Sequence, residues 1–169
     1  MKSCFLLLLF IPYFATLSFS QSTSTDDENR LREFLFIKAF VGIKSVRSVD
    51  KAGCAFVEPL SADESTILCF DKNQRVTGWA IYDSKTKNIT YNKFILVNKD
   101  SSEYIGKLER IDITVGESVD QNGIAKKERI SNDGTAYLCF DKDNFIVGWT
   151  KSNQYGLFDF YEIILRIKE

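Results

Sequence analysis

The sequence predicts a mainly β protein, an antiparallel barrel or sandwich built from two similar meander halves, with one short helix near the N-terminus. The first observation is a repeat: Leu-Cys-Phe-Asp-Lys at residues 68–72 returns at residues 138–142, and Gly-Trp at residues 78–79 returns at residues 148–149. The same offset holds upstream, where Ser-Val-Asp at residues 48–50 returns at residues 118–120. A register kept over this length indicates an internal duplication.

The second observation is a series of short β-type runs separated by polar turns. Residues 53–60, 66–71, 76–83 and 89–97 are rich in Val, Ile, Phe, Tyr, Trp and Thr, and the second half follows the same plan. Connections this short favour antiparallel neighbours, because parallel strands need a long crossover. The middle run of each half is apolar on both faces, which is typical of a strand inside a packed core.

These patterns place a first repeat at residues 30–100 and a second at residues 101–169, both expected in one compact unit with a shared core. A helix is expected over residues 30–41, where Leu31, Phe34, Leu35 and Lys38 recur at helical spacing. The apolar run at residues 34–37 would equally begin a strand. The alternative architecture is two small α+β repeats, in which residues 102–110 would supply the second helix.

The segment at residues 1–20 has the features of a signal peptide. Lys2 supplies a positive charge, residues 5–11 form a short apolar core, and Ser18 and Ser20 place small residues before the expected cleavage site. The apolar core is shorter than the ~20 residues that span a bilayer. Residues 21–29 are expected to form a flexible polar N-terminus. We therefore expect a secreted, extracellular protein without a membrane span.

The composition excludes several classes of function. The chain has 22 basic and 23 acidic residues in a mixed order, which argues against nucleic-acid binding. It contains no histidine, so Ser-His and Cys-His catalysis and the usual zinc ligand sets are excluded. The expectation is a protein that is not an enzyme and that carries no metal and no cofactor.

Three cysteines remain after the signal peptide. If the strands before and after the turn at residues 61–64 form a hairpin centred between Ser61 and Ala62, Cys54 lies opposite Cys69, so a disulfide between them is expected. In the second copy Cys139 would face Ile124 and would be a free thiol. A disulfide between Cys69 and Cys139 is the alternative.

The duplicated Gly-Trp and Asp positions have a structural and a functional interpretation. Trp79 and Trp149 are expected to fill the core, and the alternative is that they line a ligand cavity with Phe70 and Phe140. Asp71 and Asp141 each end a strand and begin a polar turn, where Asp is common. A carboxylate pair of a hydrolase is the less favoured interpretation of these two residues.

Two further features bear on function. Asn88 begins the only Asn-x-Ser/Thr sequence of the chain, which predicts N-glycosylation in an exposed turn. Tyr155, Leu157 and Phe158 make the last hairpin loop apolar, whereas the first copy has a polar loop there. The sequence therefore predicts a secreted protein that binds an extracellular protein partner; the alternative is a carrier of a small apolar ligand held between the two β halves. The oligomeric state is left open.

Overall fold

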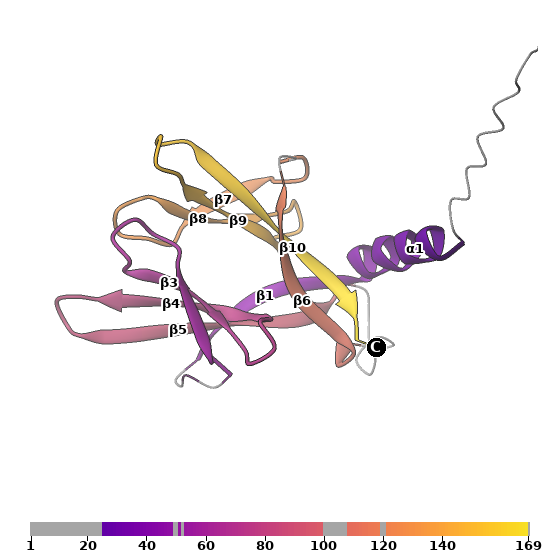
Figure 1. The fold of residues 1–169 in the computed structure, drawn as a ribbon, viewed down its shortest axis with the longest axis horizontal. Coiled ribbons are helices and arrows are strands. Elements are labelled where there is room, and N and C mark those ends of the chain that lie inside the picture. The colour runs from indigo at the N-terminus through magenta and orange to yellow at the C-terminus, as the bar shows by residue number, and fades with distance from the viewer. Residues whose placement is uncertain (1–24, 49–50, 52, 100–107, 119–120, 169) are drawn as a thin grey trace, which may run out of the picture.

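The computed structural model describes residues 25–48, 51, 53–99, 108–118 and 121–168, which form one helix and two five-stranded antiparallel sheets (Figure 1). The helix is α1 (Thr25–Phe40). The first sheet contains β1 (Val41–Ser48), β2 (Phe56–Pro59), β3 (Thr66–Phe70), β4 (Val76–Asp83) and β5 (Asn88–Asn98) in the order β1-β5-β4-β3-β2. The second contains β6 (Ile111–Ser118), β7 (Lys126–Arg129), β8 (Ala136–Phe140), β9 (Ile146–Ser152) and β10 (Phe158–Ile167) in the order β6-β10-β9-β8-β7.

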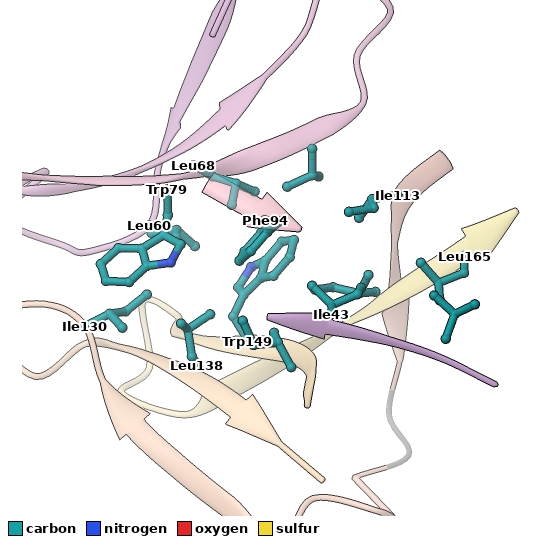
Figure 2. Close-up of a cluster of buried hydrophobic side chains, with 14 of the residues drawn as sticks. Ile43, Leu60, Leu68, Trp79, Phe94, Ile113, Ile130, Leu138, Trp149 and Leu165 are labelled. Carbon is teal, nitrogen blue, oxygen red and sulfur yellow. The ribbon is translucent and has the colours of Figure 1, made fainter. Parts of the chain in front are cut away.

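The mainly β class is confirmed, and the barrel form of the prediction is wrong. Within the described residues no backbone ladder joins a strand of one sheet to a strand of the other, so the sheets do not close. Their buried faces meet in one hydrophobic cluster, which Figure 2 shows between the two sheets. The labelled members of the cluster are Ile43, Leu60, Leu68, Trp79, Phe94, Ile113, Ile130, Leu138, Trp149 and Leu165. A shared core of this kind fits a sandwich and does not fit two separate α+β units.

Helix α1 begins at Thr25, so residues 25–29, which were expected to be flexible, are helical. Asp26, Asp27 and Glu28 lie in its first turn, where negative charge interacts favourably with the helix dipole. Only Ile37 is buried, and the helix projects from the sheets in Figure 1. The second helix of the α+β alternative falls mostly on residues 102–107, which lie outside the described residues.

The duplication expected from the sequence appears in the strand boundaries and in the turns. Each strand of the second sheet begins at the residue that the repeat makes equivalent to the start of its counterpart in the first sheet. Gln74 and Asn144, one in each copy, both have a φ of 61°. Arg75 forms an ion pair with Asp112 at 3.0 Å, and the equivalent Phe145 packs against Gly42 in the opposite direction. Reciprocal contacts of this kind relate the halves by an approximate twofold axis.

The last strand departs from this symmetry by one residue. In the first sheet Trp79 pairs with Asn92, whereas in the second sheet Trp149 pairs with Tyr161. A residue of β10 therefore lies one position earlier in the sequence than the repeat predicts for its structural counterpart in β5. The structural counterpart of Asn88 is thus Leu157. Because Tyr161 takes the place of Asn92, Trp149 lies directly opposite an aromatic residue and Trp79 does not.

Two equivalent turns meet on the twofold axis. The Asp133 carboxylate accepts a hydrogen bond from the Asp63 backbone N–H at 2.9 Å, and the Thr135 hydroxyl accepts one from the Ala62 N–H at 2.8 Å. Desolvation by neighbouring groups acts to raise the pKa of Asp133, but hydrogen bonds from Thr135, Ser131 and the Asp63 N–H hold it well below its usual value. These turns, rather than Asp71 and Asp141, bring duplicated carboxylates together.

We predict that Asp133→Asn removes an acid-sensitive contribution to stability. A carboxylate with a lowered pKa stabilises the fold in full above its unfolded pKa of about 3.9, and the contribution decreases below that value until the pH has fallen through the lower folded-state pKa. Because Asp133 is exposed, solvent screening reduces the expected loss at about pH 7 to about 1 kcal/mol. Urea unfolding should show this loss in full near pH 7 and a clearly smaller loss near pH 2.5. Asp143→Asn is the control, since this exposed side chain accepts no hydrogen bond from any described residue; an equal loss in both variants would contradict the prediction.

Candidate functional site

The structure brings together two of the four aromatic residues that were expected to line a ligand cavity. Phe70 and Trp149 line a cavity of about 310 Å³ between the two sheets. Trp79 lines a different space of about 20 Å³, enough for about one water molecule. Phe140 lines neither space, and the Lys126 ammonium lies over its ring, 5.4 Å from the ring centre. The four residues therefore do not line one cavity.

The intersheet cavity has an apolar floor and a charged mouth. Leu60, Leu68 and Trp149 are buried at its floor. The Trp149 ring stacks on the Tyr161 ring, with centroids 6.0 Å apart and an interplanar angle of 17°. Phe70 and Val115 are half-buried in the walls, and Glu58 and Glu117 are exposed at the mouth.

The charges at the mouth are not balanced. The Lys151 ammonium donates a hydrogen bond to the Pro59 carbonyl at 2.8 Å. Glu58 and Glu117 form no ion pair with any of the described residues. The pKa of the Tyr161 phenol is raised, first by burial and then by the negative charges of Asp159, Glu117 and Glu58. The aromatic wall therefore lies in a negative electrostatic environment.

The twofold-related positions have different chemistry. Arg47 occupies the position equivalent to Glu117, and Asn92 the position equivalent to Tyr161. Glu128, the counterpart of Glu58, forms an ion pair with Lys126. The combination of an aromatic pair with two carboxylates that form no ion pair with the described residues therefore occurs at one of the two twofold-related positions. Sequence reasoning missed Tyr161 because the one-residue shift of β10 cannot be read from the repeat.

The last hairpin presents an apolar surface. We call Tyr155, Leu157 and Phe158 the apolar tip; their exposed fractions are 78%, 66% and 43%. The Asn153 side chain orders the loop, because its Oδ1 accepts hydrogen bonds from the backbone N–H groups of Tyr155 and Leu157, each at 3.0 Å. Its Nδ2 donates to Asp159 Oδ1 at 3.2 Å. The apolar side chains are thus exposed on a loop with a defined conformation.

The three described cysteines are free thiols in the structure, and the hairpin register predicted for them is wrong. Cys69 pairs with Val57 rather than with Cys54, and Cys139 pairs with Lys127 rather than with Ile124. Even so, Cys54 and Cys69 line the same small space. Burial raises the pKa of Cys69 to about 12, and a hydrogen bond with Cys54 adds to the effect. Burial also raises the pKa of Cys139 to about 11. A disulfide between Cys54 and Cys69 stays a prediction.

Asp71 and Asp141 form equivalent turns. Asp71 Oδ1 accepts hydrogen bonds from the N–H groups of Asn73 and Arg75, at 2.8 and 2.9 Å. Asp141 Oδ1 accepts the two equivalent bonds, both at 2.9 Å, and its Oδ2 lies 3.5 Å from the Lys99 ammonium. Both carboxylates are therefore used in local structure, as the turn interpretation predicts.

A second crevice of about 290 Å³ lies between β1 and strands β9 and β10. Its charged groups are paired with each other: Lys99 with Asp141, and Lys38 with Glu162. A charged ligand would have to break these ion pairs, so this crevice is the weaker candidate for a binding site.

Asn88 is exposed at the start of β5, as an accessible glycosylation site requires.

The fold and the site define a mainly β protein with two stacked antiparallel sheets, an aromatic cavity between them and an apolar hairpin tip. No known protein family, curated protein or solved structure matches this chain. In the part of the chain that the structure describes, no helix has the length and apolar character to cross a membrane. No three His, Cys, Asp or Glu side chains gather as possible metal ligands among the same residues.

Proposed function

We propose that this protein is a secreted, non-enzymatic binding protein that arose by duplication of one meander and engages an extracellular protein through the apolar tip. The observation that carries the proposal is the exposure of Tyr155, Leu157 and Phe158 on one ordered hairpin. Single exposed apolar residues are common on protein surfaces. Three on one loop tip leave apolar area in water, and a partner protein would remove it.

The order of the loop also supports binding. Association costs free energy when a flexible loop must become ordered, and the hydrogen bonds to Asn153 reduce that cost. Tyrosine is frequent among residues that contribute most to interface energy. The first copy has Ser84, Lys85, Thr86 and Lys87 in the equivalent loop, so its loop is polar, although Tyr82 and Ile89 are exposed on the adjoining strands.

A site-specific cross-linking experiment tests this proposal. A benzophenone photo-crosslinker is placed at residue 155 and, as a matched control, at residue 85, and each protein is irradiated in the extracellular fluid into which the chain is secreted. We expect one discrete protein adduct from residue 155 and none from residue 85. Unlabelled wild-type protein should suppress the adduct, and a double variant carrying Leu157→Ser and Phe158→Ser should not. The absence of an adduct at residue 155, or the same adducts from both sites, would contradict the proposal.

The intersheet cavity supports a second candidate function, a carrier of a small apolar ligand. Its volume of about 310 Å³ reaches the lower end of the range of small-molecule sites, roughly 300–1,000 Å³. Phe70 and Trp149 provide the apolar contacts in this case, while Trp79 and Phe140 do not take part.

A further inference from the structure

The intersheet cavity combines stacked aromatic rings with negative charge. Trp149 and Tyr161 are directly opposite each other on β9 and β10, and their rings stack at 6.0 Å between centroids. Glu58 comes from β2 of the first sheet and Glu117 from β6 of the second, so the two carboxylates approach the cavity from opposite halves. Aromatic faces and carboxylates both attract cations.

We propose that this cavity binds a small organic cation with an apolar body, with its ammonium group at Glu58 and Glu117 and its apolar part against Trp149 and Tyr161. The inference rests on the second candidate function and changes the ligand class from apolar to cationic. The volume of about 310 Å³ suits a molecule with a single ring.

The charge balance selects against other ligands. Glu58, Glu117 and Lys151 together carry one net negative charge at the mouth, and a monovalent cation neutralises it. The hydrogen bond to the Pro59 carbonyl fixes the Lys151 ammonium at 2.8 Å from that oxygen. An anionic ligand would meet two carboxylates without partners. A neutral ligand would gain the apolar contacts and none of the electrostatic attraction.

The position that the twofold axis relates to this cavity provides an internal comparison. Its equivalent positions hold Arg47 in place of Glu117 and Asn92 in place of Tyr161. Glu128, which corresponds to Glu58, is already paired with Lys126. A cation therefore has one site per chain, and Glu128 is the matched position for a control variant.

Isothermal titration calorimetry with three probes of similar shape tests the proposal. The probes are the cation 2-phenylethylamine, the neutral 2-phenylethanol and the anion 3-phenylpropionate, each titrated at neutral pH into the full chain. We expect one site per chain and at least tenfold tighter binding of the amine than of the alcohol, with no binding of the carboxylate. Glu117→Gln should weaken amine binding about fivefold, as expected for a partly exposed charge pair, and leave alcohol binding unchanged. Glu128→Gln should leave both unchanged.

The outcomes separate the two levels of the inference. Equal affinity for the amine and the alcohol would overturn the cationic class while the carrier function stands. Failure of both probes to bind would overturn the cationic site and the carrier function together. Amine binding that is unaffected by Glu117→Gln, or equally weakened by Glu128→Gln, would overturn the assignment of the site. Circular dichroism of each variant confirms that its fold is unchanged.

Discussion

Gly148→Ala is expected to destabilise the protein by about 3 kcal/mol, the upper end of the usual cost of overpacking, because a β-carbon at this position would collide with the neighbouring strand. It would lie 2.1 Å from the Tyr161 carbonyl oxygen and 2.8 Å from the Phe160 ring. The Tyr161 carbonyl belongs to the backbone of β10, so relief of the clash requires the two strands to separate. Gly78→Ala should behave in the same way, since its β-carbon would lie 2.0 Å from the Asn92 carbonyl oxygen.

Gly116→Ala is the matched control for these variants. It also replaces a strand glycine, but the β-carbon would meet only the end of the flexible Ile164 side chain, at 2.8 Å from Cδ1. Alanine is otherwise favoured over glycine in a strand by roughly 0.5–1 kcal/mol, so this change should alter stability by less than about 1 kcal/mol. Urea unfolding followed by circular dichroism measures all three variants. Equal stability of Gly148→Ala and Gly116→Ala would show that close strand contact is not the reason for the repeated glycine.

Trp149→Ala is expected to destabilise the protein by about 3–5 kcal/mol, as truncation of a large core side chain usually does. The Trp149 side chain is buried in the cluster shared by both sheets (Figure 2). Such a loss is a large part of a typical stability of roughly 5–15 kcal/mol. Because the core is shared, the variant should lower the stability of the first half as well as the second.

Trp79 reports on the first half in this experiment, since it is the only tryptophan left in Trp149→Ala. Its fluorescence transition in urea should coincide with the circular dichroism transition, and both should occur at lower urea than in the wild type. Tyr155→Ala is the control, because this exposed side chain should contribute less than about 0.5 kcal/mol. A Trp79 transition that stays at a higher urea concentration than the circular dichroism transition would indicate that the halves unfold independently.

The sequence predicted the strands well because their determinants are local. The runs at residues 66–71 and 76–83 correspond to β3 (Thr66–Phe70) and β4 (Val76–Asp83). Trp79 and Trp149 were expected to fill the core, and both are buried, while the glycine before each of them lies close to the neighbouring strand. Alternation of residue types and turn chemistry act over a few residues, so they can be read without knowledge of the rest of the chain.

The Cys54–Cys69 register was wrong because the hairpin is centred on Asp63 and not between Ser61 and Ala62. Leu60 donates to the Thr66 carbonyl, and the Ser61 and Asp63 side chains accept hydrogen bonds from the following backbone, which moves the centre of the hairpin. The position of the hairpin centre decides every pairing along both strands. Cys69 therefore pairs with Val57, three positions from the predicted partner.

Two antiparallel meanders, each with one tryptophan, follow from the amino-acid pattern alone. Three other features depend on how the halves pack: the sheets stack without closing, the turns at Asp63 and Asp133 meet on the twofold axis, and Trp149 rather than Trp79 faces a cavity of ligand size. The repeat makes the halves nearly equivalent, so it cannot distinguish their two tryptophans. The distinction arises because β10 is shifted by one residue, which places Tyr161 beside Trp149, and because side chains from opposite sheets meet only after the halves have packed together.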